Sequence, residues 1–291
     1  MASSNAYFSP CKVNYTLAIT GVRSDGFHNL VSLVAPTRMG DDLFIDMADS
    51  DSIECNLEGV PCDESNLVMK AAILFRQATG LDKYFKFNLI KRTPHGAGLG
   101  GGSSNGAIAL KAINGMCGSP LGIEALSNLS AQMGSDCPLF LSGSPIIMSG
   151  RGECVRFLPK PAEDFIKSLK LLIFKPDFSI NTGWAYKCMR ESGAYYVSEE
   201  SANEMLEAWL TSPSLETLPL FNNMQAPAFT KFPAIEAALE FVRGKYAVPA
   251  IMSGSGSACF AITNNLEAGS VESLKHDLRE RLGESCFISE A

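Results

Sequence analysis

Residues Pro94 to Leu110 read P-H-G-A-G-L-G-G-G-S-S-N-G-A-I-A-L, and this stretch decides the fold and the chemistry that the sequence predicts. Six glycines lie between Gly96 and Gly106. Glycine lets the backbone approach an anion closely, and the first turn of a helix offers unpaired N–H groups at the positive end of its dipole. The stretch therefore predicts a loop that binds a diphosphate or a triphosphate.

The flanking segments favour phosphate binding over a flexible linker. Phe85 to Ile90 is strand-like, and Ala107 to Ile113 has the periodicity of a helix that ends near Gly115. A strand, a glycine loop and a helix N-terminus in that order are typical of phosphate-binding sites.

Two common phosphate loops fit poorly. Gly96, Gly98 and Gly101 match G-x-G-x-x-G, but a dinucleotide-binding fold also needs an acidic residue about 20 positions later. That region is instead the turn Gly118–Gly122. A P-loop requires Gly-Lys-Ser/Thr, and no lysine follows these glycines.

The pattern that fits is P-x-x-x-G-L-G-x-x-S-S, through which the chain resembles the GHMP kinases. Two further segments carry the resemblance: S-P-C-K-V-N at Ser9–Asn14, followed by D-G-F-H at Asp25–His28, and M-S-G-S-G-S-A at Met252–Ala258. Their order and separations suit that superfamily over almost the whole chain. The resemblance implies a two-domain α+β fold with the active site in the cleft between the domains.

The linker-like segment Leu158–Asp164 predicts the domain boundary. We expect an N-terminal ATP-binding domain over residues 1–158 and a C-terminal domain over residues 159–291. Periodicity alone supports a mixed α/β chain with a break near residue 160.

Local signals predict several elements outside the loop. A helix over Leu67–Thr79 is capped by Asn66 and ended by Gly80, and another opens at Ser119-Pro120 and runs to Met133. The remaining expectations are a strand at 12–19, hairpin-like strands at 43–45 and 53–55, a strand at 169–175, a mainly helical stretch to 243, a strand pair around 251 and 260, and a last helix at 267–282.

The resemblance implies ATP as the phosphate donor, with Mg²⁺. The ATP-binding residues that it implies are Pro94, Gly96, Ala97, Gly98, Leu99, Gly100, Gly101, Gly102, Ser103 and Ser104, with Asn66 at the nucleotide base. Ser104 is the candidate Mg²⁺ ligand. From the residues alone, Asn66 is equally well explained as a helix cap.

Asp136, in G-S-D-C-P at Gly134–Pro138, is the candidate catalytic base. By itself this aspartate before a proline reads as a helix cap. The resemblance makes it the group that accepts the alcohol's proton, and places Lys12 beside it. An isolated lysine on a strand is otherwise a solvated charge.

The resemblance also implies a cytosine pocket, in which two aromatic rings sandwich the base and a histidine reads its edge. The substrate-binding residues that it implies are Asn14, Phe27, His28, Thr182 and Tyr186. Phe27 stands where the kinases of this superfamily that bind a cytidyl substrate usually have tyrosine. The phenylalanine keeps the stacking contact and lacks the hydroxyl contact. From the residues alone, Phe27 can be a core aromatic and His28 a polar turn residue. Arg151 is either a phosphate contact or an exposed turn residue.

Within the superfamily the chain most resembles the 4-diphosphocytidyl-2-C-methyl-D-erythritol kinases, which implies a cytidyl diphosphate alcohol as substrate. Another small-alcohol kinase, such as a homoserine or mevalonate kinase, stays open, as does a non-catalytic nucleotide-binding regulator. The presence of both Lys12 and Asp136 speaks against a regulator.

Composition bounds the partners and the compartment. The net charge of −7 and the lack of any basic run argue against nucleic-acid binding. Val248–Leu266 is uncharged, but its glycines, serines and asparagines favour strand, loop and strand over a membrane span. The first residues, M-A-S-S-N-A-Y-F, lack the pattern of a signal peptide, so a cytoplasmic location is expected. Oligomeric state is not predicted.

The nine cysteines are scattered without metal-binding spacing, which favours reduced packing residues. Cys11 adjoins Lys12, whose charge can lower the pKa of the thiol and make it reactive.

Overall fold

The structure is a computed structural model that describes residues 5–291. The prediction that the chain lacks a signal-peptide pattern rests partly on residues 1–4, which lie outside the described residues. The chain forms two compact units. The first comprises the described residues up to Lys12, Pro36–His95 and Gly100–Ser144, and the second comprises Val13–Ala35, Gly96–Leu99 and Pro145–Ala291.

These units divide the chain differently from the domains expected at residues 1–158 and 159–291, which stay a prediction. The long strands β1 (Asn5–Val22) and β2 (His28–Ala48) each contribute one part to each unit. The glycine stretch is shared in the same way, because Gly96–Leu99 belongs to the second unit and Gly100 onward to the first.

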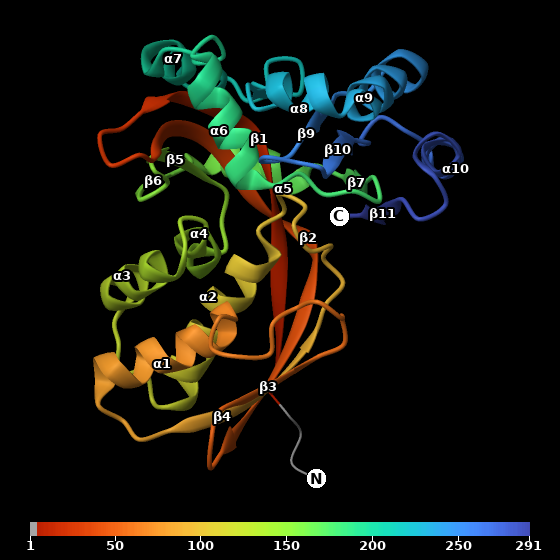
Figure 1. Ribbon diagram of the computed structural model, residues 1–291. Helices are drawn as coiled ribbons and strands as arrows, with labels where there is room; N and C mark the ends of the chain where they lie inside the picture. The colour runs from red at the N-terminus through yellow and green to blue at the C-terminus, as the bar shows by residue number, and fades with distance from the viewer. Residues whose placement is uncertain (1–4) are drawn as a thin grey trace. The chain divides into compact units, whose positions relative to one another are not determined.

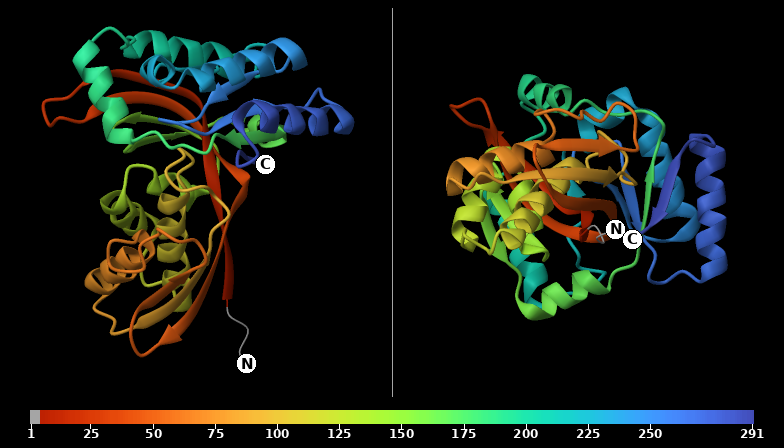
Figure 2. Two further views of the ribbon diagram at one scale, coloured as in Figure 1. Left: turned by 45° about the vertical axis from the view of Figure 1, so that its right-hand side comes forward. Right: turned by 90° about the horizontal axis from the view of Figure 1, so that it is seen from below.

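In the first unit, the end of β2 pairs antiparallel with β4 (Tyr84–Ile90), and β4 pairs parallel with β3 (Ser52–Cys55). The predicted hairpin between residues 43–45 and 53–55 is therefore wrong, since both segments pair with β4 instead. Four helices pack together on one side of these strands (Figures 1 and 2). They are α1 (Leu67–Thr79), α2 (Gly101–Met116), α3 (Ile123–Met133) and α4 (Cys137–Ser142).

Helix α1 has the bounds that its local signals predict. The side chain of Asn66 accepts a hydrogen bond from the Val68 amide at 3.0 Å, and Gly80 ends the helix with a φ of 68°. A side chain at Gly80 would strain this left-handed conformation, so glycine ends the helix cheaply. Val68 and Phe75 turn inward and are fully buried.

The helix expected from Ser119 begins later, at Ile123. Ser119 has a φ of 57°, and its amide bonds to the Asn114 carbonyl at 2.7 Å, so it closes α2. The Asn114 side chain also bonds the amide and the carbonyl of Leu121, at 3.0 and 3.1 Å. Ser119 and Pro120 therefore form a turn held by the preceding helix.

The second unit contains an antiparallel four-stranded sheet in the order β11-β7-β10-β9. Its strands are β7 (Leu171–Lys175), β9 (Ala250–Met252), β10 (Cys259–Ile262) and β11 (Phe287–Glu290). The beginning of β2 pairs with β5 (Ile146–Gly150), which pairs with β6 (Cys154–Phe157). The short β8 (Phe221–Asn222) runs parallel to β1.

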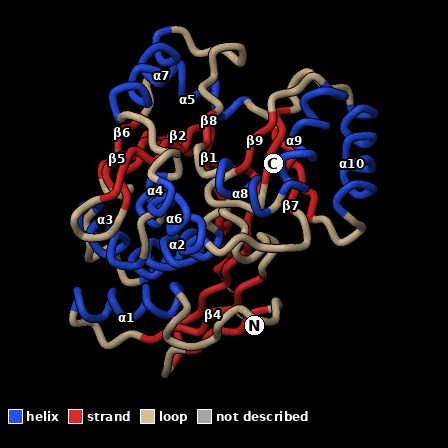
Figure 3. Tube along the Cα trace, turned by 45° about the horizontal axis from the view of Figure 1, so that its top comes forward, coloured by secondary structure: helices blue, strands red, loops and turns tan. Residues whose placement is uncertain are grey.

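Six helices belong to this unit: α5 (Lys160–Ser168), α6 (Thr182–Ser192), α7 (Glu199–Thr211), α8 (Gln225–Lys231), α9 (Pro233–Tyr246) and α10 (Ala268–Leu282). Most of the expected linker is thus the start of α5. Leu172 and Phe174 of β7 share a core with Leu239 of α9 and Leu278 of α10, and Figure 3 shows both helices beside the sheet. Across residues 5–291, no helix has the length and apolarity to cross a membrane.

Candidate active site

Lys12 and Asp136 are brought together in the first unit. Lys12 lies on β1 and Asp136 directly precedes α4, and their Nζ and Oδ2 atoms are 3.6 Å apart. The lysine side chain is 6% exposed and the aspartate side chain 39% exposed. A nearly buried ammonium therefore stands beside a carboxylate that substrate can reach.

Asp136 occupies the cap position of α4 without acting as a cap. Among the described residues, its carboxylate accepts no hydrogen bond from the first turn of that helix. Pro138 stands in the first turn and has no N–H to offer. The carboxylate is therefore available as a proton acceptor, which favours the catalytic interpretation over the cap.

Gly100 places the start of α2 against the lysine. Its φ is 66°, and a Cβ there would lie 3.0 Å from Lys12 Cγ and 3.2 Å from Phe140 Cζ. Among the described residues, no side chain caps the first turn of α2. Its amides are therefore available to an anion. A Cβ on Gly102 would lie more than 4 Å from every described residue outside the surrounding turns of α2, so the backbone there is open.

The rest of the glycine stretch packs within the second unit against the loop Met252–Ala258, which we call the third motif. A Cβ on Gly98 would lie 2.4 Å from the Ser253 carbonyl oxygen, and the φ of Gly98 is 77°. The Ala258 amide donates to the Ala97 carbonyl at 3.1 Å. The two glycine-containing loops are thus directly hydrogen-bonded.

A buried hydrogen-bond network, which we call the Asp41 network, supports the helix start in the first unit. Lys91 forms an ion pair with Asp41 and donates to Asn105 Oδ1 at 3.1 Å. The side-chain nitrogen Nδ2 of Asn105 donates to the Asp41 carboxylate and to the Ser9 hydroxyl, both at 2.9 Å. Ser9 then donates to the Ser104 hydroxyl oxygen at 2.8 Å.

Sequence reasoning assigned no role to the members of the Asp41 network other than Ser104. Asn105 lies within the glycine stretch and Ser9 opens the segment Ser9–Asn14, but no local signal points to Asp41 or Lys91. Asp41 also accepts from the amides of Arg92 and Thr93, at 2.8 Å each. Burial opposes ionisation, but the Lys91 charge and these hydrogen bonds outweigh it and lower the pKa of Asp41. The network fixes the segment that leads into the loop.

Asn66 uses both ends of its amide within the protein. Its oxygen caps α1, and its nitrogen donates to the Pro61 carbonyl at 2.7 Å. The cap interpretation is confirmed, and the contact with the nucleotide base stays a prediction. Pro94 is half-buried at the entrance to the glycine loop.

In the second unit, His28 and Tyr186 lie against each other. Their ring centroids are 4.8 Å apart with an interplanar angle of 40°, and a third ring, Tyr196, lies 6.1 Å from His28. His28 is buried, and burial together with the charge of Arg190 lowers the pKa of the imidazole. Among the described residues, His28 Nε2 has no hydrogen-bond partner.

Phe27 is 53% exposed, so the interpretation as a core aromatic is wrong. The guanidinium carbon of Arg151 lies 4.6 Å from the centroid of its ring, a cation–π arrangement. Arg151 therefore packs on an exposed ring, and its predicted phosphate contact stays a prediction.

Asn14 and Thr182 both contact the third motif of the second unit. The Asn14 amide donates to the Ser253 hydroxyl at 3.3 Å, while its side chain donates to Ser32 at 2.9 Å. The Thr182 hydroxyl lies 2.9 Å from that of Ser255. The loop Met252–Ala258 thus connects two of the predicted substrate residues.

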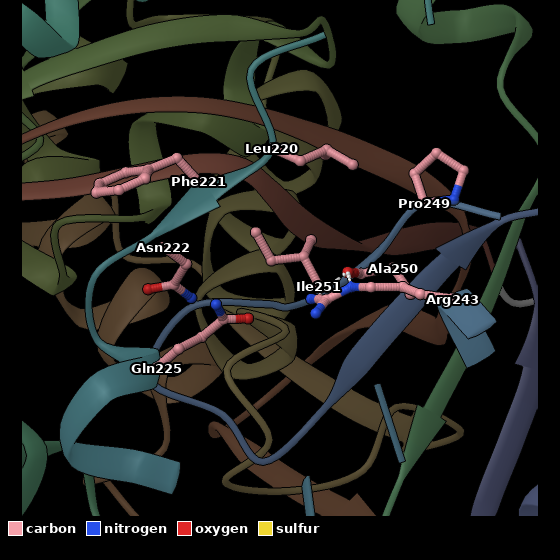
Figure 4. Close-up of a pocket in the computed structure, with 8 residues that line it drawn as sticks. All are labelled: Leu220, Phe221, Asn222, Gln225, Arg243, Pro249, Ala250 and Ile251. Atoms are coloured by element: carbon pink, nitrogen blue, oxygen red, sulfur yellow. Dashed lines mark hydrogen bonds between the residues drawn. The ribbon is translucent and has the colours of Figure 1, made fainter. Parts of the chain in front are cut away.

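A pocket of about 320 Å³ lies elsewhere in the second unit and contains none of the predicted site residues (Figure 4). Its polar side chains hold the outer edge of β9. Arg243 donates to the Ala250 carbonyl at 2.8 and 3.0 Å, and Gln225 accepts from the Met252 amide at 3.1 Å. Asn222 donates to the carbonyls of Met252 and Gly254, at 2.8 and 2.9 Å. These groups stabilise an edge strand and the start of the third motif.

Cys11 is a buried packing residue, and the alternative of a reactive thiol is excluded. Burial raises the pKa of this thiol to about 12, and the nearby Lys12 charge lowers it too little to compensate. A thiol with that pKa stays protonated and unreactive at neutral pH.

Comparisons with known proteins identify the family of the chain. Residues 66–144 match the GHMP kinases N terminal domain, and residues 199–282 match the GHMP kinases C terminal domain. The 4-diphosphocytidyl-2-C-methyl-D-erythritol kinase of Methylacidiphilum infernorum is 36% identical over 294 residues, which cover 99% of this chain and 97% of that protein.

The chloroplastic kinase of the same name from Arabidopsis thaliana is 37% identical over 262 residues, covering 88% of this chain. The match covers 66% of the plant protein, so the chain spans a little less than two thirds of that relative. A crystal structure of 4-(cytidine 5′-diphospho)-2C-methyl-D-erythritol kinase superposes with a TM-score of 0.77 and 27% identity over 98% of both chains. These matches confirm the predicted α+β fold, and the chain belongs to the GHMP kinase family.

Proposed function

We propose that the chain phosphorylates the 2-hydroxyl of 4-diphosphocytidyl-2-C-methyl-D-erythritol with ATP, a step of the non-mevalonate route to isoprenoid precursors. The kinase chemistry is supported by the Lys12–Asp136 pair, 3.6 Å apart, with Gly100 at the start of α2 packed on Lys12. The choice of substrate is supported by the names of the relatives and by the paired rings of His28 and Tyr186.

Phosphoryl transfer to an alcohol needs a proton acceptor and groups that offset negative charge. Asp136 accepts the hydroxyl proton as the oxygen attacks the γ-phosphorus of ATP, and the bond from that phosphorus to the β,γ-bridging oxygen breaks to release ADP. Lys12 orients this carboxylate and offsets charge that develops on the transferred phosphoryl group. The amides of Gly101, Gly102 and Ser103 bind phosphate oxygens, helped by the dipole of α2.

The residues present fit Mg²⁺, which takes one or two protein oxygens and fills its other positions with phosphate and water. Ser103 is half-buried and its side chain is hydrogen-bonded to Cys137, whereas Ser104 is 0% exposed and bonded to Ser9. Burial therefore favours Ser103 as the ligand over Ser104. The bound ion would neutralise phosphate charge.

The cytidyl end of the substrate is proposed to contact the second unit. Phe27 and Tyr186 offer aromatic faces, His28 reads the base edge, and Asn14 and Thr182 add polar contacts. We also propose a cytoplasmic location, since all nine cysteines are free, as suits a reducing compartment.

The product of the reaction tests this proposal. The protein is incubated with ATP, Mg²⁺ and the cytidyl alcohol, and the mixture is followed by ³¹P NMR. We expect ADP and one new phosphomonoester on the 2-hydroxyl. Binding of ATP without any transfer would instead support the non-catalytic regulator.

A further inference from the structure

Two buried polar atoms of the second unit have no hydrogen-bond partner among the described residues, and they belong to one aromatic cluster. They are Nε2 of His28 and the hydroxyl of Tyr196. The ring centroids of these two residues are 6.1 Å apart. His28 begins β2, and Tyr196 lies in the segment between α6 and α7.

The two unsatisfied atoms are chemically complementary. A phenol donates a hydrogen bond, and the unprotonated nitrogen of a neutral imidazole accepts one. Because burial and Arg190 lower the pKa of His28, the ring is neutral at neutral pH. Each atom left unpaired destabilises the protein, so a hydrogen bond between them is favourable when the two side chains rearrange.

We propose that Tyr196 is a positioning residue for pyrimidine recognition, whose hydroxyl donates to His28 Nε2 when the base binds and holds the imidazole proton on Nδ1. This inference rests on the proposed function, because it assumes that His28 reads a cytosine.

The position of that proton decides which base is accepted. An imidazole that carries its proton on Nδ1 presents a donor to the ligand. Cytosine offers acceptors at N3 and O2, whereas uracil carries a proton on N3. A fixed Nδ1–H therefore pairs with the N3 edge of cytosine and leaves a donor facing a donor with uracil.

Tyr196→Phe separates this role from a structural one. The substitution removes only the hydroxyl, which has no partner in the free protein, so thermal stability should stay equal or increase. If Tyr196 positions His28, the affinity for a cytidine nucleotide nevertheless falls in Tyr196→Phe. Tyr195→Phe is the matched control, since Tyr195 is the adjacent residue and packs on the same core as Tyr196.

The experiment measures the affinity of cytidine 5′-diphosphate and uridine 5′-diphosphate by calorimetry, together with Tm, for the wild type and both variants. We expect Tyr196→Phe to weaken cytidine diphosphate roughly 3- to 10-fold, the effect of one lost hydrogen bond, and to leave uridine diphosphate unchanged. Tyr195→Phe should change neither. In ¹⁵N spectra of the cytidine diphosphate complex, the His28 signal, assigned by its loss in His28→Asn, should show Nε2 unprotonated.

Equal cytidine diphosphate affinity for Tyr196→Phe and the wild type would overturn the inference, as would a proton on His28 Nε2 in the complex. Both results leave the proposed function standing if the wild type still phosphorylates the cytidyl alcohol. A wild-type protein that neither binds cytidine diphosphate nor phosphorylates that alcohol contradicts the proposed function itself.

Discussion

At the scale of single residues, the environment of Asp136 separates a proton acceptor from a helix cap. The carboxylate of an aspartate that precedes a helix usually accepts hydrogen bonds from the amides of the first turn. Here Pro138 removes one of those amides, and the carboxylate faces Lys12 at 3.6 Å. The Asp136 carboxylate is therefore paired with Lys12 and stays partly exposed, so that a substrate hydroxyl can reach it.

Asp136→Asn keeps the size of the side chain and removes the proton acceptor. We expect kcat to fall by roughly 10²–10⁴, with the ATP dissociation constant nearly unchanged. Steady-state kinetics and calorimetry of the folded variant check this. Asp164→Asn is the control and should be silent, because Asp164 lies on the exposed face of α5 and, within residues 5–291, forms an ion pair only with Lys160. Near-normal turnover of Asp136→Asn would remove this residue from the catalytic role.

The lowered pKa of His28 predicts a pH dependence for substrate binding. The groups around the imidazole are Tyr186 and Arg190 of α6 and Tyr196 of the following segment. The ring stays neutral until the pH falls below the ordinary histidine value of about 6.5. KM for the cytidyl substrate should be flat above that pH. It should rise as the pH falls through the lower folded pKa, because protonation of Nε2 removes the acceptor for the Tyr196 hydroxyl and charges a buried ring.

KM measured between about pH 8 and pH 5 tests this expectation, and His28→Asn supplies a background that cannot titrate. A rise in KM that is the same in both proteins would assign the titration to another group.

At the scale of elements, the first turn of α2 makes a sharp distinction between neighbouring glycines. A Cβ on Gly100 meets Lys12 and Phe140, whereas a Cβ on Gly102 lies more than 4 Å from every described residue outside the surrounding turns of α2. Gly102→Ala should therefore leave Tm equal or raise it, because alanine favours the helix. ATP affinity should fall nonetheless, since the added methyl faces the phosphates.

Gly100→Ala is expected to lower both Tm and turnover, because the new methyl meets the Lys12 side chain at a positive φ. Thermal melts and ATP calorimetry on the two variants separate the effects. Unchanged ATP affinity for Gly102→Ala would mean that the phosphates bind elsewhere.

The Asp41 network links the strand end near Lys91 to α2, and Asp41→Asn leaves a buried lysine without its counter-charge. We expect a loss of about 3–5 kcal/mol in the free energy of unfolding at pH 7. Asp42→Asn is the matched control, because Asp42 pairs with Arg92 at the surface, where such pairs contribute less than about 1 kcal/mol. Urea unfolding measures both, and equal losses would show that burial of the pair is unimportant.

The sign of the Asp41 shift sets the pH range of that stabilisation. A carboxyl with a lowered pKa stabilises the folded protein above its unfolded value of about 3.9, and the contribution is lost as the pH falls through the folded pKa. The difference between the wild type and Asp41→Asn should therefore shrink only in acid.

Elements fixed by local chemistry could be predicted from the sequence, and those fixed by distant partners could not. Helix α1 follows from the cap at Asn66 and the stop at Gly80. By contrast, β3 takes β4 as its partner, and the turn at Ser119 is held by Asn114 on the previous helix. Such pairings depend on tertiary contacts that no local window contains.

The same division holds for the candidate site. Lys12 and the glycine loop belong to recognisable motifs, and the structure brings Lys12 beside Asp136. Asp41, Lys91 and Tyr196 went unnoticed, because a single polar residue in a strand or a loop carries no periodic or motif signal. Their roles come from burial and from partners distant in the sequence.

At the scale of the whole molecule, two compact units share β1, β2 and the glycine stretch. Lys12 and Asn14 are two residues apart on β1 yet belong to different units. Side chains at i and i+2 of a strand point to the same face. Chain connectivity by itself therefore keeps a predicted catalytic residue near a predicted substrate residue on β1.

The most direct test of the central claim compares kcat/KM for three alcohols with ATP and Mg²⁺: 4-diphosphocytidyl-2-C-methyl-D-erythritol, homoserine and mevalonate. ADP release is measured for the wild type, with Asp136→Asn as the background. We predict that the cytidyl alcohol exceeds the other two by at least roughly 10³-fold, because neither offers a base to the His28–Tyr186 pair. Phosphorylation of homoserine or mevalonate in preference to the cytidyl alcohol would contradict the account.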